Sequence, residues 1–242
     1  MAAAFVDLHC HTRASFDCLS APGAVVKAAA ERGLTHLAIT DHDRIDGALE
    51  ARDLAPAGLT VIVGEEVKTA DGDLICLFLE RAIPPGLSAS ETIAAARDQG
   101  GLVGIPHPFD RLRGSLLREE RLAVLGDRVD WVETHNARVV GHGNQRAAEY
   151  AIGRGLSGVA VSDAHSILEI GVAYTKLEGD PSTPAGLLAA LAALAGVQLV
   201  PGRASLVVRA WTPVAKAVQR SRGNRRVQPR ARTTTGDRGD TT

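Results

Sequence analysis

Short, continuous apolar runs alternate with Ala-rich amphipathic stretches along most of the chain. Runs without polar alternation are typical of parallel strands that are covered on both faces. The expected strands are Phe5–His9, His36–Thr40, Thr60–Glu66, Leu74–Leu79, Leu102–Pro106, Trp131–Thr134, Val159–Ser162 and Val172–Leu177. The expected helices are Ala21–Arg32, Ile45–Leu54, Ser90–Gln99, Gly143–Gly153 and Thr183–Ala195. This alternation predicts an α/β fold with a parallel sheet, either open and doubly wound or closed into a barrel.

The alternation stops near Trp211, and the stretch from Ser221 onwards has almost no apolar residues. Such a segment cannot bury enough surface to offset the entropy lost on ordering. We therefore expect a folded domain over residues 1–210 and a disordered basic tail over residues 211–242. The charge is divided in a similar way. Eight Lys/Arg and two Asp from Lys216 onwards give +6, and subtracting this from the overall −1 leaves −7 for residues 1–215.

The composition narrows the class of protein. With 45% hydrophobic and 23% charged residues among 242, the chain is globular, and with only 3% aromatics its core is built from Ala, Val, Leu and Ile. The three cysteines, Cys10, Cys18 and Cys76, cannot all pair, which favours a reducing, cytoplasmic compartment. The longest apolar run, Leu187–Val200, is too short to span a bilayer, and the first residues lack a secretory signal. We expect no membrane association.

Histidine and carboxylate residues, the types that bind metals, lie at the ends of five of the expected strands. They are His9 and His11, Asp41 to Asp43 with His42 between them, Glu65 and Glu66, His107, and Asp163 with His165. Ligand sites of parallel α/β folds lie at the carboxyl ends of the strands. Residues i and i+2 of an extended segment point the same way, so each His-x-His or Asp-x-His pair can bind one ion.

Any one of these pairs is weak evidence, because capping, a salt bridge or a buried histidine explains it. Together they are hard to explain by packing, because unpaired buried charges are costly. Imidazole and carboxylate ligands suit Zn, Mn or Fe(II). The ligands are too many for one tetrahedral ion, so the pattern predicts two or three divalent ions that share a bridging carboxylate.

The order and spacing of these motifs resemble the PHP (polymerase and histidinol phosphatase) family of metal-dependent phosphoesterases over roughly residues 5–205. The matching segments are DLHCHT at 7–12, ITDHD at 39–43, Gly64 to Val67, PHP at 106–108, Asn136-Ala137-Arg138 and SDAH at 162–165. The resemblance implies a distorted seven-stranded (β/α) TIM-like barrel with the metals at its C-terminal rim. It also implies a phosphoric ester hydrolase of the small single-domain type.

The resemblance further implies which residues bind the ions. His9 and His11 would hold the first metal together with Asp163 and a bridging Glu66, because the family motif is G-x-E. His107 would belong to the second metal. His42 and His165 would hold a third with Asp17, a hard ligand that favours Mn, Mg or Fe. The sequence departs from the family at Asp73, where a further ligand is often histidine, and at His135, where an apolar or aromatic residue is common.

The expected reaction is in-line attack on phosphorus by a metal-bound hydroxide. Arg13 and Arg138 are the candidates for pairing with the phosphate oxygens, because guanidinium does so in a bidentate way. His135 is an extra ligand, a general acid or a wall of the substrate pocket. The expected substrate is a small phosphorylated metabolite, a nucleotide or a short oligonucleotide cleaved from its 5′ end.

Two other functions compete with this interpretation. An amidohydrolase also places His-x-His on a barrel, with a carbamylated lysine for which Lys68 is the candidate, but Glu66 already supplies a bridge. A non-catalytic, metal-stabilised binding module would use the basic tail on nucleic acid or an acidic partner. The tail has no aromatic residue for base stacking, so no stable nucleic-acid complex is expected.

Overall fold

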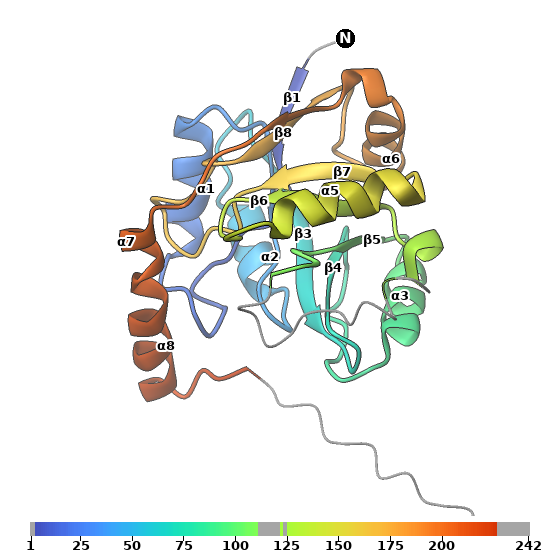
Figure 1. The fold of residues 1–242 in the computed structure, drawn as a ribbon. Coiled ribbons are helices and arrows are strands. Elements are labelled where there is room, and N and C mark those ends of the chain that lie inside the picture. The colour runs from blue at the N-terminus through green and yellow to red at the C-terminus, as the bar shows by residue number, and fades with distance from the viewer. Residues whose placement is uncertain (1–2, 111–121, 123–124, 227–242) are drawn as a thin grey trace, which may run out of the picture.

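The computed structural model describes residues 3–110, 122 and 125–226, and its centre is a nine-stranded sheet (Figure 1). The strand order is β7-β6-β5-β4-β3-β2-β1-β8-β9. The strands are β1 Ala3–Asp7, β2 His36–Ile39, β3 Thr60–Lys68, β4 Asp73–Leu77, β5 Leu102–Ile105, β6 Trp131–Asn136, β7 Ser157–Val161, β8 Tyr174–Glu178 and β9 Gln198–Val200.

Helices lie on the outside of this sheet, and a C-terminal pair lies along one side of the molecule (Figure 1). The helices are α1 Pro22–Glu31, α2 Asp46–Asp53, α3 Ala89–Arg97, α5 Gly143–Arg154, α6 Pro184–Ala192, α7 Leu206–Arg209 and α8 Trp211–Ser221. Local sequence fixes several of their ends. Ser88 and Glu91 form a capping box at the start of α3, and Gly155 adopts the left-handed conformation that ends α5.

The sheet curls into a nearly closed barrel, as expected for the fold class. The hydroxyl of Thr175 on β8 accepts from the amide of Ala160 on β7 and donates to the carbonyl of the same residue, so the two ends of the sheet meet. The predicted count of seven strands is wrong, because the sheet has nine. The sheet is also mixed rather than parallel. β4 runs antiparallel to β3 and β5, and β8 runs antiparallel to β1 and β9.

Alternate residues of each strand belong to two apolar cores. Val61 and Val63 of β3 pack in the cluster shared with the outer helices, whereas Ile62 packs with Trp131 inside the barrel. The same alternation turns Glu65 and Glu66 to opposite sides, so only Glu66 faces the cluster. Both faces are buried, which explains why the strands are continuously apolar. Cys10, Cys18 and Cys76 are buried free thiols within the sheet and its loops.

The prediction of a disordered tail from residue 211 is wrong for residues 211–226, which form α8 and the ordered stretch after it. Hydrogen bonds hold this segment rather than apolar burial. The Gln219 amide donates to the carbonyls of Arg13, Ser15 and Cys18 at 2.7, 3.0 and 2.8 Å. Residues 227–242 of the predicted tail lie outside the described residues. Among the residues described, none of the helices has the length and apolarity needed to cross a lipid bilayer.

Position 104 on β5 has to be glycine because the ring of Trp131 packs directly against its backbone. Trp131 is fully buried inside the barrel. A Cβ at position 104 would overlap the indole ring. We expect Gly104→Ala to lower the free energy of unfolding by about 2–3 kcal/mol, because backbone and ring must both shift. Urea denaturation measures this loss as a lower midpoint.

Gly153 provides the matched control for that substitution. It lies in the last turn of α5, and a Cβ there would meet nothing within 4 Å. Gly153→Ala should leave stability unchanged or raise it by about 0.5–1 kcal/mol, because alanine favours the helix. Equal midpoints for the two variants would contradict the packing role of Gly104.

Candidate metal centre

The rim of the barrel is closed by backbone pairing between the loops that follow β1 and β7. The His11 amide donates to the Ala164 carbonyl and the Asp163 amide donates to the His9 carbonyl, both at 2.9 Å. Cys10 and Ala164 form an isolated parallel bridge between these bonds. The pairing brings segments more than 150 positions apart into register, and it sets both ligand pairs side by side.

A second bridge extends the pairing of β2 and β3. His42 and Glu66 form an isolated parallel bridge, and the Glu66 amide donates to the Asp41 carbonyl at 3.2 Å. The Thr40 amide donates to the Cys10 carbonyl at 2.8 Å, which ties this pair of strands to the loop after β1. The four strand ends thus deliver their polar side chains to one rim.

His9, His11, Glu66 and Asp163 form the deepest part of the cluster, and all four are fully buried. The Nε2 atoms of the two histidines are 3.0 Å apart. Oε2 of Glu66 lies 3.3 and 3.4 Å from these nitrogens, and Oδ1 of Asp163 lies 3.6 and 3.5 Å from them. Nε2 of His107 lies 3.4 Å from the other Glu66 oxygen, Oε1. Glu66 therefore faces histidines with both oxygens.

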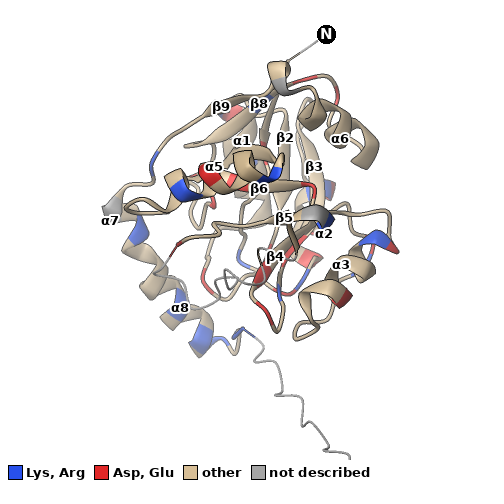
Figure 2. Cartoon of the chain, turned by 45° about the vertical axis from the view of Figure 1, so that its right-hand side comes forward, with Lys and Arg blue, Asp and Glu red and all other residues tan. Residues whose placement is uncertain are grey.

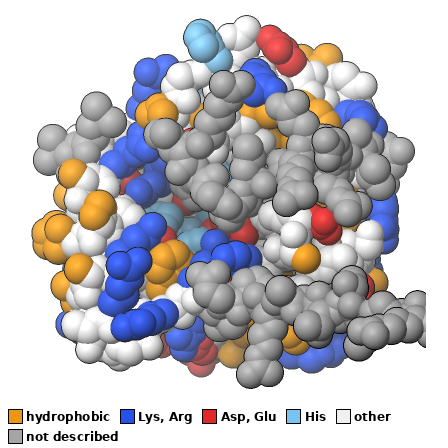
Figure 3. Space-filling model, turned by 60° about the horizontal axis from the view of Figure 1, so that its bottom comes forward, with side chains coloured by type: hydrophobic (Ala, Val, Ile, Leu, Met, Phe, Trp, Pro, Cys, Tyr) orange, Lys and Arg blue, Asp and Glu red, His pale blue; other side chains and the backbone are white. Residues whose placement is uncertain are grey.

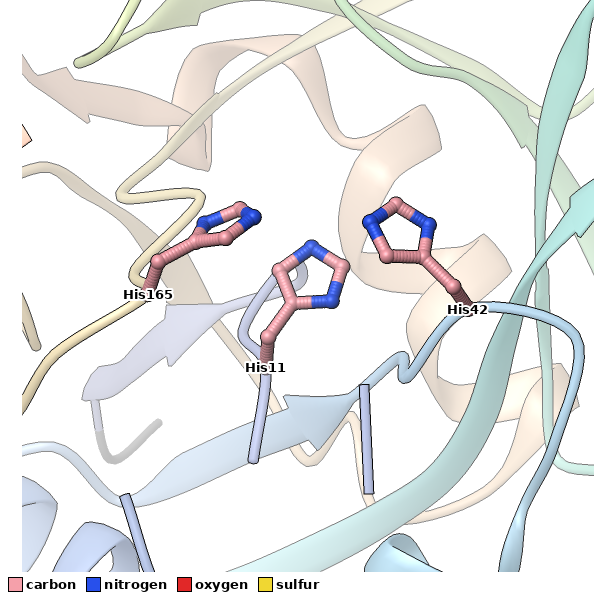
Figure 4. A group of neighbouring side chains, drawn as sticks. All are labelled: His11, His42 and His165. Carbon is pink, nitrogen blue, oxygen red and sulfur yellow. The ribbon is translucent and has the colours of Figure 1, made fainter. Parts of the chain in front are cut away.

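A third group lies beside the first. Figure 4 shows His11 between His42 and His165, which come from separate loops. Oδ2 of Asp17 lies 3.4 Å from Nε2 of both His42 and His165. All eight residues that the sequence predicts as ligands are thus brought together. They supply groups of ligand atoms within 4.8 Å of one another, such as His11–His42–His165 and His9–His107–Asp163.

Hydrogen bonds fix which ring nitrogen of each histidine faces the cluster. Nδ1 of His9 donates to Glu133 at 2.6 Å, and Nδ1 of His165 donates to the Asp163 carbonyl at 2.9 Å. Nδ1 of His11 donates to the hydroxyl of Ser15 at 3.0 Å, because that hydroxyl gives its own proton to Asp41. In all three rings Nε2 is the nitrogen that faces the cluster, as in metal-binding histidines.

Two of the candidate ligands have strained backbones. His107 has φ +27° and Asp163 has φ +53°, in the left-handed region that non-glycine residues rarely adopt. Such strain costs about 1–3 kcal/mol and is found mostly at functional sites. At position 107 the amide donates to Glu133 at 2.9 Å, and the Asp163 carboxylate accepts from Asn136 at 3.0 Å. These bonds hold the two strained residues in place.

The protonation of the cluster suits cation binding. Burial opposes ionisation of Glu66, yet His42 and His107 hold the pKa of its carboxyl well below the usual range. Asp17 likewise has a lowered pKa because the charges of His42 and His165 outweigh burial. Burial and the neighbouring His165 and His42 lower the pKa of His11, which keeps its ring neutral. Burial opposes protonation of His9 and His42, yet the charges of Glu133 and Asp163 raise the pKa of His9, and those of Glu66 and Asp17 raise the pKa of His42. The cluster therefore combines ionised carboxylates and a neutral His11 with two protonated rings, whose inward protons a metal ion would displace.

The buried oxygens test whether these residues fit divalent ions. Both carboxylate oxygens of Glu66 and Oδ1 of Asp17 are buried without a hydrogen-bond donor. Buried carboxylates are costly unless a cation or donor compensates them. The Nε2 atoms of His9 and His11 lie 3.0 Å apart, a separation at which a proton or a cation has to lie near both. The donor set of imidazole and carboxylate fits a divalent metal centre.

A cavity of about 410 Å³ opens above the cluster, with Asp17, His42, Glu66 and His165 on its wall. Figure 3 shows histidines at the base of a hollow with basic side chains beside it. Five basic residues of the described chain line this cavity: Lys68, Arg138, Arg209, Lys216 and Arg226.

The predicted residues outside the ligand cluster have different fates. Arg138 lines the cavity, as predicted. Arg13 does not line it. Its guanidinium pairs with Glu50 at 2.9 Å in a separate surface pocket, so the structure gives no support to its predicted role. Both ring nitrogens of His135 bond to protein groups, Nε2 to the Gly202 carbonyl at 2.8 Å and Nδ1 to Asn144 at 3.4 Å. His135 therefore holds a neighbouring loop, and it is not among the described residues that line the cavity.

Asp73 does not face the cluster as a bare ligand. Arg226 of the C-terminal segment donates to both of its oxygens, at 2.9 and 3.0 Å, and also to Asp43 at 3.2 Å. This ion pair neutralises the carboxylate in the position where the family often has a metal-binding histidine.

Sequence reasoning missed the role of Glu133. Its carboxylate is 1% exposed, holds Nδ1 of His9 with Oε1, and accepts from the His107 amide and from Asn136 with Oε2. The only signal in the sequence is its place in a strand, three residues before the matching Asn136. One carboxylate thus orients two candidate ligands.

Comparisons with known proteins agree with this geometry. A family model described as PHP domain matches residues 7–124, and one described as PHP-associated matches residues 141–195. An uncharacterised protein of Methanocaldococcus jannaschii is 37% identical over 147 residues, which cover 54% of this chain and 81% of that protein. The fold and the metal-type cluster define a barrel with a metal centre at its rim. The chain belongs to the PHP family.

Solved structures share the fold. One is a two-domain protein from Bacteroides vulgatus containing a predicted PHP-like metal-dependent phosphoesterase. The match has a TM-score of 0.69 and 19% sequence identity, and it covers 83% of this chain and 65% of that protein's chain. Another is the lesion-specific endonuclease EndoQ from Pyrococcus furiosus, with a TM-score of 0.61 and 16% identity over 82% of this chain and 58% of its own. These likenesses show the common architecture.

The Glu133 carboxylate should control metal affinity without binding metal. We expect Glu133→Gln to weaken divalent-metal binding by about 10-fold to 100-fold, because the amide has one acceptor oxygen where the carboxylate has two. Either the His9 ring or the two donors on the other side, the His107 amide and Asn136, then lose their acceptor. Titration with Mn or Zn against a chelator measures the change, and circular dichroism checks the fold.

Glu65→Gln is the matched control for that substitution. Glu65 is as buried as Glu133, but faces the other side of the sheet and accepts from the Ile83 amide at 2.8 Å. Its variant should keep the wild-type affinity. If both variants bound metal as tightly as the wild type, Glu133 would have no part in orienting the ligands.

Proposed function

We propose that the protein is a metal-dependent phosphoesterase acting on a small phosphorylated substrate. The observation that carries this proposal is the buried cluster of eight imidazole and carboxylate ligands at the floor of a cavity lined by basic residues. Ligands of this kind bind divalent cations, and basic walls attract anions. The combination suits a substrate whose phosphate contacts both.

The ligand atoms divide among two or three ions. His9, His11 and Asp163 form one group, His107 a second, and His42 and His165 with Asp17 a third. Glu66 lies between all three, since Oε2 faces His9, His11 and His42 while Oε1 faces His107. When bound at such a site, divalent ions polarise phosphoryl oxygens and lower the pKa of water towards neutrality.

Arg138 is the chain's own cation for the phosphate. Its side chain is 7% exposed, donates to Glu169 at 2.9 Å and to Thr212 at 2.7 Å, and lines the cavity. Glu169 also accepts from the amide of His165 at 3.0 Å, so the guanidinium is fixed beside a candidate ligand. A guanidinium has five N–H donors, and those left over can stabilise charge on equatorial phosphoryl oxygens.

The same geometry favours a phosphoesterase over an amidohydrolase. The amidohydrolase alternative needs a carbamylated lysine as the bridge, and Lys68 lies at the end of β3. Glu66 already lies where that bridge would be, with both of its carboxylate oxygens facing histidines. An amidohydrolase site also leaves the pairing of His42 with Asp17 unexplained. A cavity of about 410 Å³ suits a metabolite, a nucleotide or the end of a short oligonucleotide.

Turnover of an aryl phosphate and a nucleotide panel by metal-stripped protein tests the proposal. We expect no phosphate release without metal, and release that is restored by Mn, Zn, Fe(II) or Mg. His9→Ala with His11→Ala should abolish release and metal retention together, because both central nitrogens are lost. The circular dichroism spectrum of this double variant should be that of the wild type.

The control for this experiment is His142→Ala. His142 is exposed, and its side chain makes no cap hydrogen bond at the start of α5. This variant should keep full metal dependence and turnover. Wild-type turnover in the double variant would overturn the assignment of the site. Tight binding of metal with no release from any substrate would favour the non-catalytic binding module instead.

A further inference from the structure

The C-terminal segment 206–226 supplies three of the basic residues of the cavity, although it lies beyond both family matches, which end at residues 124 and 195. Figure 2 shows basic and no acidic residues along α8. The three residues are Arg209, Lys216 and Arg226. This wall is a feature of this chain rather than of the matched family region.

The segment is fixed against the loop that carries Asp17. Gln219 is 3% exposed and donates to three carbonyls of that loop, and Asn224 donates to the Ala14 carbonyl at 3.0 Å. Near the start of α8, the Thr212 hydroxyl accepts from Arg138, which also lines the cavity. α8 is therefore held at both ends, and its basic side chains have defined positions relative to the metal-type cluster.

The basic residues of the cavity differ in how closely a carboxylate of the protein pairs with their charge. Arg226 is bound to Asp73 and Asp43, and Arg138 is bound to Glu169. Lys216 is half-buried and differs from both. Its ammonium lies 3.8 Å from Oδ2 of Asp17, longer than a hydrogen bond, and 5.3 Å from the centre of the Phe16 ring. Its nearest carboxylate oxygen is the one that faces His42 and His165.

Lys216 is thus placed between the cluster and the open side of the cavity. A phosphate at the cluster contacts the floor, where Arg138 is 6% exposed, whereas the Lys216 side chain is 39% exposed. An ion bound by Asp17 takes up the charge that now faces the ammonium. The ammonium is then left with an aromatic face on one side and the cavity on the other. Its remaining donors fit an anionic group near the mouth.

We propose that Lys216 is a specificity-determining residue that binds a second anionic group of the substrate at the mouth of the cavity. The preferred substrates then carry a phosphate in addition to the one that is hydrolysed. This inference rests on the proposed phosphoesterase function and names its substrate class. Arg209 lines the same cavity and adds to the positive field at that end.

A pair of synthetic esters tests the assignment: butyl phosphate and butane-1,4-diol bisphosphate, which differ in the second phosphate. The metal-loaded wild type should have a KM at least about 10-fold lower for the bisphosphate, since a charge-assisted hydrogen bond is lost in the monoester. Lys216→Ala should raise the KM for the bisphosphate by about 10-fold to 100-fold. Its KM for butyl phosphate and its kcat for both should change less than about 2-fold.

Two further variants separate contact from general charge. Lys216→Arg keeps the charge at the same position and should restore most of the preference. Arg220→Ala removes the same charge from the exposed face of α8, outside the cavity lining, and should behave as the wild type. If Arg220→Ala and Lys216→Ala weakened bisphosphate binding equally, the net charge of the helix would explain the effect and the assignment would be overturned.

The outcomes also separate this inference from the function on which it rests. Hydrolysis of both esters with the same wild-type KM overturns the second anion site and leaves the phosphoesterase intact. An equal rise in both KM values in Lys216→Ala does so too, because the residue then contacts the hydrolysed phosphate. No phosphate release from either ester with any of Mn, Zn, Fe(II) or Mg overturns the proposed function, and this inference with it.

Discussion

Two backbone hydrogen bonds hold the site together, those that join His9 and His11 to Asp163 and Ala164. These two bonds bring the side chains of His9 and His11 together with those of Asp163 and His165. The remaining ligands follow from the sheet, because Thr40 bonds to Cys10 and Glu66 pairs with His42. The same backbone pairing also explains why the strained backbone of Asp163 is tolerated. The left-handed backbone turns the carboxylate to the histidines, and the bond to the His9 carbonyl holds it there.

Charge in this cluster is arranged before any ligand arrives. Glu133, Ser15 and the Asp163 carbonyl each accept a hydrogen bond from Nδ1 of one histidine. The rings of His9, His11 and His165 therefore turn Nε2 towards the cluster. The carboxylates of Glu66 and Asp17 stay ionised although buried, because histidines lie around them. Cations compensate this negative charge better than protons, since one ion contacts several ligand atoms at once. The same ligands lose protons on binding metal, which makes occupancy fall as pH falls.

Much of this arrangement could be predicted from residue order. Continuous apolar runs indicated strands covered on both faces, and the polar residue after each run indicated the rim. All eight expected ligands meet there. The antiparallel direction of β4 and β8 could not be predicted, because apolar runs carry no direction. Arg13 illustrates another limit. Two positions after His11 the chain has left the strand, so spacing no longer states where a side chain points, and Arg13 lies against Glu50 instead.

The C-terminal helix was missed for a different reason. The scarcity of apolar residues predicts disorder, and α8 does bury little apolar surface, with Trp211 50% and Val214 44% exposed. It is held by the amide of Gln219 and by the ion pairs of Arg226, which hydrophobic patterning does not detect. Gln219 contacts Ser15 across 204 positions of sequence. Contacts of such separation form late and slow folding. In a growing polypeptide the Asp17 loop can bond to Asp41 early, but it lacks the Gln219 bonds until nearly all of the described chain has been synthesised. Completion of the cavity is therefore one of the last steps of biogenesis.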